Sequence, residues 1–460
     1  MTEVENVEPS VPPDPLQSMT LTQFAGELRS GEFKAEHITS AYLQRIAELD
    51  GKIGAFRNVA GDRALAAARG IDALLEAGTD LGPLMGVPIA VKEIFATNGF
   101  PFGAGTELDL RPITPPQGEF MQNLRRAGCV ILGTTATTEF AAATINLKKP
   151  MPWNPVDPQT KRVCGGSSHG SAAAMSAGLC AFSVGSDTGG SVRLPAALCG
   201  VFGYKSTAGL WPTAGVFSLS PTMDSIGIFT RFAEDAALVF ATLAKDNMAD
   251  LPRATALRVG KPRTHFFEQL DAPVRLSVEV ALGKLRAAGA EIVDIEVPDI
   301  EASMPGFTQL LFADFVSVMG HERLRAGHAT MDPVPWARIE TSFGVEAETL
   351  VALRQRQRQA VSLACDMMSG VDALVTPTTP FCACPVDEVG TLEKASAWNL
   401  RSGRNTRPGN YFGQCGTTIP IQQGSDLPIG LQIICRPGAD SQLLAISRTI
   451  EAIVGSKSHH

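Results

Sequence analysis

Residues 86–92 read Gly-Val-Pro-Ile-Ala-Val-Lys, and this short apolar run decides the fold class. Side chains alternate between the two faces of a strand, so Val87, Ile89 and Val91 share one face and Lys92 lies on the other. The pattern predicts a buried strand that ends at Lys92. A lysine at the end of a buried strand is unusual, because its charge is costly to remove from water.

Helices and strands alternate on both sides of this run. Downstream, the pattern predicts a helix over residues 118–127, a strand over 129–133 and a new helix that begins at Thr138, which is typical of βα units in a largely parallel sheet. The sequence therefore predicts an α/β protein. Further predicted elements are helices over 21–28, 35–49, 62–76, 172–177 and 441–454, and strands over 180–186, 372–377 and 429–434.

Composition changes along the chain indicate its organisation. Residues 1–18 are acidic and rich in proline, and we expect a flexible segment there. Residues 19–456 are expected to form one domain, in which residues 245–370 are richer in charge and in helical periodicity. We interpret 245–370 as a helical covering layer that sets substrate specificity, and 457–460 as a tail.

Charge and cysteine content exclude several classes of protein. The chain of 460 residues carries 39 basic and 47 acidic residues without a basic stripe, which disfavours a nucleic-acid partner. It has neither the apolar run of about 20 residues that a membrane span needs nor a signal peptide. Its nine cysteines are mostly flanked by apolar residues, which favours reduced thiols and a cytoplasmic protein. One C-x-C pair, Cys382 and Cys384, is too little to predict a metal site, and we expect no metal and no cofactor.

The common catalytic templates lack their residues. The sequence contains no H-E-x-x-H, no paired C-x-x-C, no G-x-x-x-x-G-K-[ST] and no G-x-S-x-G elbow with a matching histidine. Hydrolysis would therefore need another set of residues.

Two further segments accompany the Lys92 strand. Residues 165–171 read Gly-Gly-Ser-Ser-His-Gly-Ser, and residues 187–193 read Asp-Thr-Gly-Gly-Ser-Val-Arg. In order and type the three segments resemble the amidase signature family, with its strand-borne lysine in G-V-P-[IV]-x-V-K, its G-G-S-S-G-G-S loop and its D-x-G-G-S-x-R turn. Ser191 follows Ser167 by 24 residues, as in that family's triad. The resemblance covers nearly the whole chain, is weakest between 245 and 370, and includes the family's urethane-cleaving bacterial members.

The resemblance implies a fold and a catalytic triad. The expected fold is a single large mixed, mostly parallel sheet covered by helices on both faces. Ser191 is expected to be the nucleophile, Ser167 the bridging serine on a cis peptide, and Lys92 the base. Without histidine, the base must be a lysine that is neutral when it acts, which requires its pKa to fall from about 10.4 to roughly 7 to 8.

Residues around the triad are expected to support it. Glycines allow backbone N–H groups to approach a developing oxyanion, so we expect an oxyanion hole from the backbone of Thr188, Gly189, Gly190 and Ser191. We expect supporting hydrogen bonds or ion pairs, without direct catalysis, from Gly166, Ser168, Asp187 and Arg193.

Two positions depart from the family pattern. Glu93 follows the lysine where an aspartate is common, which is a mild change. His169 replaces a glycine, and it could either add a group that titrates near neutrality or cap the following helix; we favour the structural role.

The expected function is hydrolysis of amide-type C–N bonds through an acyl-enzyme, on small-molecule amides and also on carbamates and aryl esters. Two alternatives stay open: a glutamine-hydrolysing component of an amidotransferase, and a catalytically silent binding protein on the same scaffold. The chain could be a monomer or a homodimer, and the sequence does not identify the substrate.

Overall fold

The computed structural model describes residues 12–244, 248–297, 300–421 and 427–455. Its strands are β1 (Phe56–Val59), β2 (Pro88–Lys92), β3 (Val130–Thr135), β4 (Phe182–Asp187), β5 (Phe202–Lys205), β6 (Ser225–Thr230), β7 (Arg258–Pro262), β8 (Glu291–Ile295), β9 (Ala373–Pro377), β10 (Cys415–Ile421) and β11 (Ile429–Cys435). They form one 11-stranded sheet in the order β1-β3-β2-β4-β6-β5-β10-β11-β9-β7-β8. The predicted α/β class and single large sheet are confirmed.

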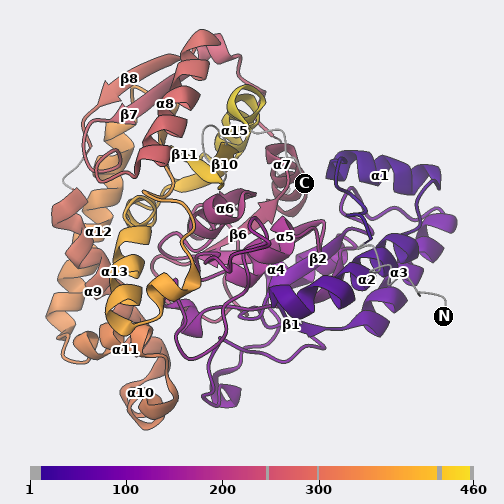
Figure 1. Cartoon of the computed structure of the whole chain (residues 1–460), viewed down its shortest axis with the longest axis horizontal. Helices are drawn as coiled ribbons and strands as arrows, with labels where there is room; N and C mark the ends of the chain where they lie inside the picture. Colours follow the sequence, from indigo (N-terminus) through magenta and orange to yellow (C-terminus); the bar gives the residue numbers. More distant parts are fainter. Residues whose placement is uncertain (1–11, 245–247, 298–299, 422–426, 456–460) are drawn as a thin grey trace, which may run out of the picture.

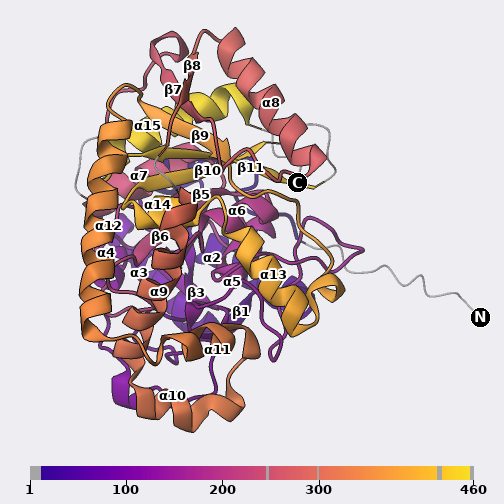
Figure 2. The ribbon, with the colours of Figure 1, turned by 90° about the vertical axis from the view of Figure 1, so that its left-hand side faces the viewer.

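Helices lie on both sides of this sheet; in Figure 2, for example, α12 and α13 occupy opposite sides of the molecule. The helices before β4 are α1 (Leu21–Ser30), α2 (Ala35–Ile53), α3 (Gly61–Glu76), α4 (Glu119–Arg126) and α5 (His169–Ser176). The later helices are α6 (Arg193–Cys199), α7 (Ala233–Ala244), α8 (Ala272–Ala287), α9 (Ile300–Met319), α10 (His321–Gly327), α11 (Pro333–Ile339), α12 (Ala347–Met367), α13 (Leu392–Ser402), α14 (Arg407–Tyr411) and α15 (Asp440–Val454). Figure 1 shows the chain passing from α1–α3 at one end to β7, β8 and α8 at the other. None of the helices among the described residues is both long and apolar enough to span a bilayer.

Strand direction changes across the sheet. The pairs β2–β3, β2–β4, β7–β8 and β7–β9 are parallel, whereas β1–β3 and every pair from β4 through β6, β5, β10 and β11 to β9 are antiparallel. The sheet is therefore mixed, but parallel pairing dominates only towards its two ends. The central strands are antiparallel because β5 follows α6 directly and joins β6, and β10 joins β11, without the crossover helix that parallel neighbours require.

The region 245–370 contains more than the predicted helical layer. It holds α8 to α12, but also β7 and β8, which extend the sheet at one end. The prediction missed these strands for a physical reason. β8 is an edge strand whose side chains are half-buried or exposed, so its sequence carries charges instead of a clear apolar run.

The N-terminal segment is partly fixed. Residues 1–11 of the predicted flexible stretch 1–18, and most of the predicted tail, lie outside the described residues. Leu16, however, is buried in the main core. Asp14 pairs with Arg231 and accepts a hydrogen bond from the Tyr42 hydroxyl at 3.1 Å. The prediction of flexibility is therefore wrong for residues 14–16, which this ion pair and the buried leucine hold against the domain.

The predicted helix at Thr138 is also absent. Residues Glu139–Ala141 form a single 3-10 turn, and both Phe140 and Ala141 adopt positive φ, 55° and 56°. The chain turns back because the Thr138 hydroxyl donates to the Ala143 carbonyl at 2.7 Å. We refer to residues 138–144 as the 138–144 loop, and it lies beside the candidate site.

Candidate active site

Strand order brings the predicted segments together. β2 and β4 are parallel neighbours, so their carboxyl ends meet at the same edge of the sheet. Lys92 ends β2, and Ser186 and Asp187 end β4. The loop before α5 adds Ser167, and the turn between β4 and α6 adds Ser191.

Lys92 is fully buried and contacts hydroxyl groups. Its Nζ donates to Ser167 Oγ at 2.8 Å and to Ser186 Oγ at 3.0 Å, and it forms no ion pair among the described residues. Burial lowers the pKa of the Lys92 ammonium from 10.5 to about 7. Three more distant carboxylates act in the opposite direction, namely Asp187, Asp224 and Glu93. Lys92 is therefore poised to lose its proton near neutral pH.

Ser167 is held from its backbone. A cis peptide bond joins it to Gly166, and its carbonyl accepts hydrogen bonds from Thr137 Oγ1 at 3.1 Å and Thr138 N at 3.2 Å. A side chain at Gly166 would collide with the 138–144 loop, since an added Cβ would lie 2.8 Å from the Thr144 carbonyl oxygen. The glycine thus allows this loop to close over Ser167.

Ser191 is half-buried at the start of α6. Its carbonyl accepts the Ser168 N–H at 3.3 Å, and Ser168 Oγ donates to the Ser186 carbonyl at 3.2 Å. Its hydroxyl makes no hydrogen bond with Ser167 among the described contacts. The structure therefore joins Lys92 to Ser167 directly, and brings Ser191 beside them through the backbone of Ser168.

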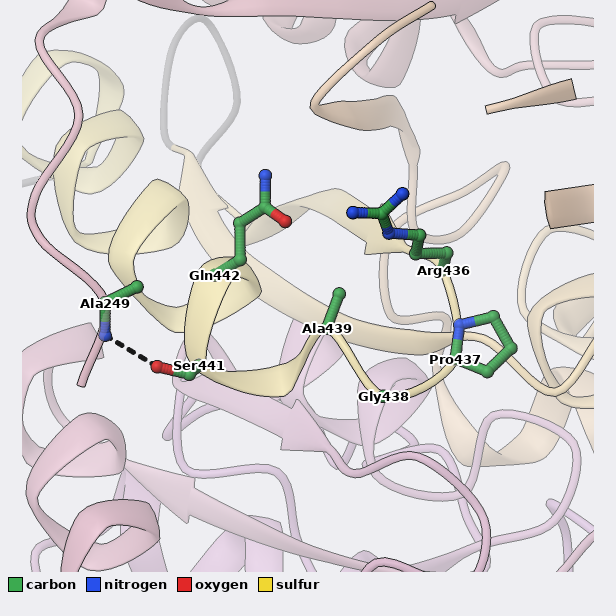
Figure 3. Close-up of a pocket in the computed structure, with 7 residues that line it drawn as sticks. All are labelled: Ala249, Arg436, Pro437, Gly438, Ala439, Ser441 and Gln442. Atoms are coloured by element: carbon green, nitrogen blue, oxygen red, sulfur yellow. Dashed lines mark hydrogen bonds between the residues drawn. The ribbon is translucent and has the colours of Figure 1, made fainter. Parts of the chain in front are cut away.

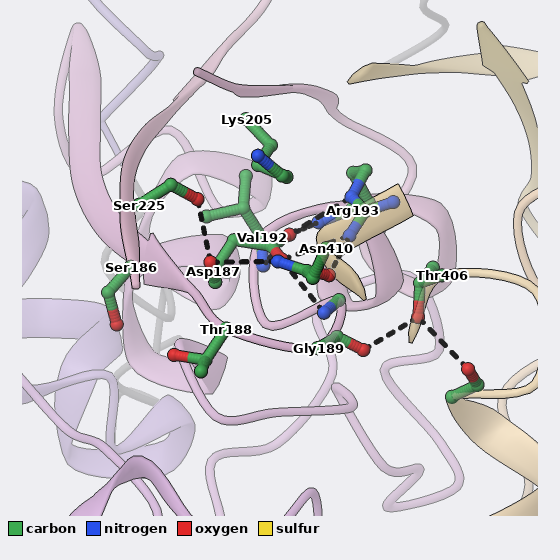
Figure 4. Close-up of polar contacts among 12 residues, drawn as sticks. Ser186, Asp187, Thr188, Gly189, Val192, Arg193, Lys205, Ser225, Thr406 and Asn410 are labelled. Carbon is green, nitrogen blue, oxygen red and sulfur yellow. Dashed lines mark hydrogen bonds and ion pairs between the residues drawn. The ribbon is translucent and has the colours of Figure 1, made fainter. Parts of the chain in front are cut away.

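Asp187 organises the turn that carries Ser191, as Figure 4 shows. Its carboxylate accepts the N–H groups of Gly190 at 2.8 Å, Val192 at 3.1 Å and Arg193 at 3.3 Å. This corrects one prediction, because the Gly190 N–H already has an acceptor and is not free for an oxyanion. The backbone N–H groups of Thr188, Gly189 and Ser191 have no acceptor within the described part of the chain.

The Asp187 carboxylate is paired with a buried arginine. Arg193 Nη2 and Nε contact it at 3.0 and 3.1 Å, and both side chains are almost fully excluded from solvent. Burial raises the pKa of Asp187, but the charge and hydrogen bonds of Arg193 outweigh it and hold that pKa well below its usual range. The predicted supporting pair is thus a buried ion pair, although its role in activity stays a prediction.

Two amides that sequence reasoning missed complete this network. Asn410 Nδ2 donates to Asp187 Oδ1 at 2.9 Å, and its Oδ1 accepts from Arg193 Nη2 at 2.6 Å. Gln432 Oε1 accepts from Arg193 Nη1 at 2.8 Å. These residues lie more than 200 positions further along the chain, and no local pattern linked them to the turn.

The glycines of the turn are also fixed from outside. Thr406 Oγ1 donates to the Gly189 carbonyl at 2.9 Å (Figure 4). Gly190 has φ 120°, and a Cβ there would lie 2.0 Å from the same hydroxyl oxygen, so only glycine fits. Thr188 Oγ1 donates to Asp224 at 2.6 Å, and burial raises the pKa of that carboxyl to about 6.

His169 is buried, and neither ring nitrogen has a hydrogen-bond partner among the described residues. Burial, and then the charges of Arg57 and Lys92, lower its pKa to about 3. Its neutral form therefore dominates near pH 7, which argues against the titrating role. The capping role is wrong as well, because α5 begins at His169 itself and its ring bonds to no helix N–H.

Other parts of the surface lack this chemistry. A hollow at the start of α15 is lined by Arg436, Ser441, Gln442 and neighbours, where Ala249 N donates to Ser441 Oγ at 2.6 Å (Figure 3). None of its lining residues belongs to the three predicted segments. Among the residues that the structure describes, no group of three or more His, Cys, Asp or Glu side chains is arranged to hold a metal ion.

Comparisons with known proteins agree on one family. The family model described as Amidase matches residues 37–444. A 2-amino-5-chloromuconic acid deaminase from Comamonas testosteroni is 33% identical over 450 residues, covering 95% of this chain and 96% of the relative. A glutamyl-tRNA(Gln) amidotransferase component from Salinispora arenicola (strain CNS-205) is 31% identical over 489 residues, covering 96% and 98%.

Solved structures have the same architecture. A crystal structure of an amidase matches with a TM-score of 0.86 at 26% identity, covering 95% of this chain and 100% of the other. The native peptide amidase of Stenotrophomonas maltophilia matches with a TM-score of 0.79 at 25% identity, covering 97% and 99%.

Proposed function

The chain belongs to the amidase family, whose members hydrolyse amide C–N bonds, and we propose that it does so through an acyl-enzyme formed on Ser191. The observation that carries this proposal is the buried hydrogen bond between Lys92 Nζ and Ser167 Oγ. The pKa of Lys92, lowered by burial to about 7, supports it, because a neutral amine can accept a proton along this contact.

The proposed first step forms the bond between Ser191 Oγ and the substrate carbonyl carbon. The Ser191 proton passes to Ser167 Oγ, while the Ser167 proton passes to Lys92 Nζ. Free N–H groups of Thr188, Gly189 and Ser191 stabilise the oxyanion; one such donor typically contributes about 3 kcal/mol to transition-state binding. Ser191 Oγ approaches Ser167 when substrate binds, since catalytic hydrogen bonds are often long in a free enzyme.

The second step breaks the C–N bond. Lys92 returns its proton through Ser167 to the leaving nitrogen, which departs as a neutral amine or ammonia. Water then attacks the acyl group on Ser191 and loses a proton to the same relay, which releases the acid and restores the hydroxyl. Carbamates and aryl esters suit the same steps, because they differ only in the group beside the carbonyl or in the leaving atom.

Replacement of Ser191 tests this proposal. Ser191→Ala should abolish turnover of a panel of aryl amides, carbamates and esters while the fold and melting temperature are retained. Intact-mass spectrometry should detect an acyl adduct on the wild-type chain and none on the variant. Appreciable turnover by Ser191→Ala, or no labelling of wild-type Ser191 by a sulfonyl fluoride, would refute it; the latter would favour the silent binding protein.

A second candidate is a glutamine-hydrolysing component of an amidotransferase that passes ammonia to a partner chain. The Salinispora relative, named as part of such an amidotransferase and aligned over nearly its whole length, favours it. Glutaminase assay of the chain alone and with candidate partner chains distinguishes the two. Robust glutamine hydrolysis, with weak turnover of aryl amides, would select the second candidate.

A further inference from the structure

Arg338, on α11, is a half-buried guanidinium without a carboxylate partner in the described part of the structure. Its Nη1 donates to the Ala142 carbonyl at 3.3 Å, and its guanidinium lies over the Phe312 ring at 4.5 Å. Arginines of neighbouring elements are paired: Arg354 with Asp314 at 2.8 Å, and Arg404 with two glutamates. Arg338 therefore has donors to spare.

The contacts of Arg338 lead to the bridging serine. Ala142 belongs to the 138–144 loop, which donates its Thr138 N–H to the Ser167 carbonyl at 3.2 Å. The other end of this loop, at Thr144, approaches Gly166 closely. Arg338 thus contacts the same loop that closes over Ser167.

A second cation, Arg407, lies against the turn that carries Ser191. Its Cγ would be 3.6 Å from a Cβ placed on Gly189. Its guanidinium donates only to carbonyl groups among the described residues, those of Leu400 at 3.0 Å and Asn399 at 2.6 Å.

Helix α9 spans the interval between the two arginines. Its Phe307 packs against Gly189, since the ring would lie 3.0 Å from a Cβ there, and its Phe312 lies under Arg338. Thr144 of the 138–144 loop donates to Asn399 Oδ1 at 2.8 Å, next to the carbonyl that binds Arg407. Arg338 and Arg407 therefore flank the approach to Ser191 from two elements, and no acidic side chain among the described residues pairs with either.

Both charges are costly where they lie. Desolvation, together with repulsion from Arg407, lowers the pKa of Arg338 to about 9. Desolvation lowers the pKa of Arg407 to about 10. An incoming carboxylate would offset this cost, and the planar fork of a guanidinium matches its two oxygens.

We propose that Arg338 binds a carboxylate of the substrate, with Arg407 adding positive potential, so that the preferred substrates are amides that carry a free carboxylate. This inference rests on the proposed function at Ser191 and narrows its substrate class. Arg338 acts here in substrate binding, while the chemical steps stay with Lys92, Ser167 and Ser191.

A matched pair of substrates tests it: succinic acid mono-4-nitroanilide and butyric acid 4-nitroanilide, which differ by a carboxylate in place of a methyl group. The wild-type kcat/KM should favour the acid by at least about tenfold. Arg338→Met should lower kcat/KM for the acid by about 10- to 100-fold, as expected for loss of a charge-assisted hydrogen bond, and leave the neutral anilide within about twofold. Arg338→Lys should fall between them, because it keeps the charge but loses the fork.

Arg325→Met is the matched control, since Arg325 also lies over a phenylalanine ring, that of Phe343 at 5.2 Å, but on α10. It should leave the acid-to-neutral ratio unchanged. Succinate should raise the melting temperature of the wild type and of Arg325→Met, but not of Arg338→Met, and this readout needs no turnover. Equal losses on both anilides, or equal stabilisation by succinate in all three proteins, would overturn the inference. Hydrolysis through Ser191 without preference for the acid would overturn it while the proposed function stands.

Discussion

Two buried cations lie on opposite sides of the end of β4, and the chain treats them differently. Ser186 and Asp187 are successive residues of this strand, so their side chains face opposite ways. Ser186 reaches Lys92, which contacts hydroxyl groups alone. Asp187 reaches Arg193, which is surrounded by a carboxylate and two amide oxygens.

The difference shows how one fold makes a base and a brace from similar charges. Removing a cation from water is unfavourable, and a hydroxyl offsets little of the cost compared with a carboxylate. Lys92 therefore responds with a lowered pKa, whereas Arg193 keeps its charge and fixes the turn before α6. Reactivity follows from the incomplete compensation of the lysine, and rigidity follows from the full compensation of the arginine.

Replacing the lysine should give the largest effect. Lys92→Met should lower kcat/KM by about 10⁴-fold or more, because the base and the proton relay are both lost. Its free energy of unfolding should stay within about 1 kcal/mol of the wild type, since an apolar side chain of similar length removes an uncompensated buried amine. Steady-state kinetics and urea unfolding measure the two quantities. A variant that is both inactive and strongly destabilised would mean that Lys92 is a structural residue.

Replacing the arginine should reverse that pattern of stability. Arg193→Met leaves the Asp187 carboxylate buried and unpaired, which should lower the free energy of unfolding by about 3 to 5 kcal/mol. Urea unfolding of the two methionine variants side by side is the measurement. Equal stability of the two would contradict the contrast between the two cations.

How far the sequence anticipates this arrangement depends on how local each feature is. The strand that ends at Lys92, and β3 and β4 beside it, are continuous apolar runs, and the structure confirms them within about two residues. β7 and β8 were missed because they are short strands at the end of the sheet, and one is half exposed. The turn at Phe140 replaces a predicted helix because tertiary contacts there outweigh helical periodicity.

The candidate site divides in the same way. The motifs identified Lys92, Ser167 and Ser191, and the structure brings the first two into contact. Ser186 was missed, although it directly precedes the Asp187 motif, because a single serine at a strand end carries no pattern. The Gly190 N–H was misjudged because its acceptor depends on the orientation of the Asp187 side chain. Asn410 was missed because only the folded sheet brings it to the turn.

The pH dependence should separate the two cations again. Because Lys92 must be neutral to act, log kcat/KM should rise with a slope of about one below pH 7 and level off above it. Asp224→Asn should move the midpoint to lower pH, since that carboxylate raises the pKa of Lys92. A profile that is flat from pH 5 to 9 would contradict a lysine base.

Stability should follow the same titration with a definite sign. The folded-state pKa of Lys92 lies below its ordinary value of 10.5, so the unfolded chain binds more protons between about pH 7 and that value. The stability of the wild type relative to Lys92→Met should therefore increase from pH 7 to 10, and change little below 7. Urea unfolding of both proteins across this range measures it, and a constant difference would place the Lys92 pKa near its ordinary value.

The smallest expected effect concerns the second hydroxyl at Lys92. Ser186→Ala removes the 3.0 Å contact but leaves the one to Ser167, so kcat should fall about 3- to 10-fold, in line with about 1 kcal/mol for a neutral hydrogen bond. The midpoint of the pH profile should also move, because one of the two groups that orient the amine is lost. Ser183→Ala is the matched control on the same strand, where Ser183 Oγ donates to the Ser171 carbonyl at 2.8 Å, away from Lys92. It should change stability but neither kcat nor the midpoint; equal kinetic effects of the two variants would mean that Ser186 acts through the strand and not through the lysine.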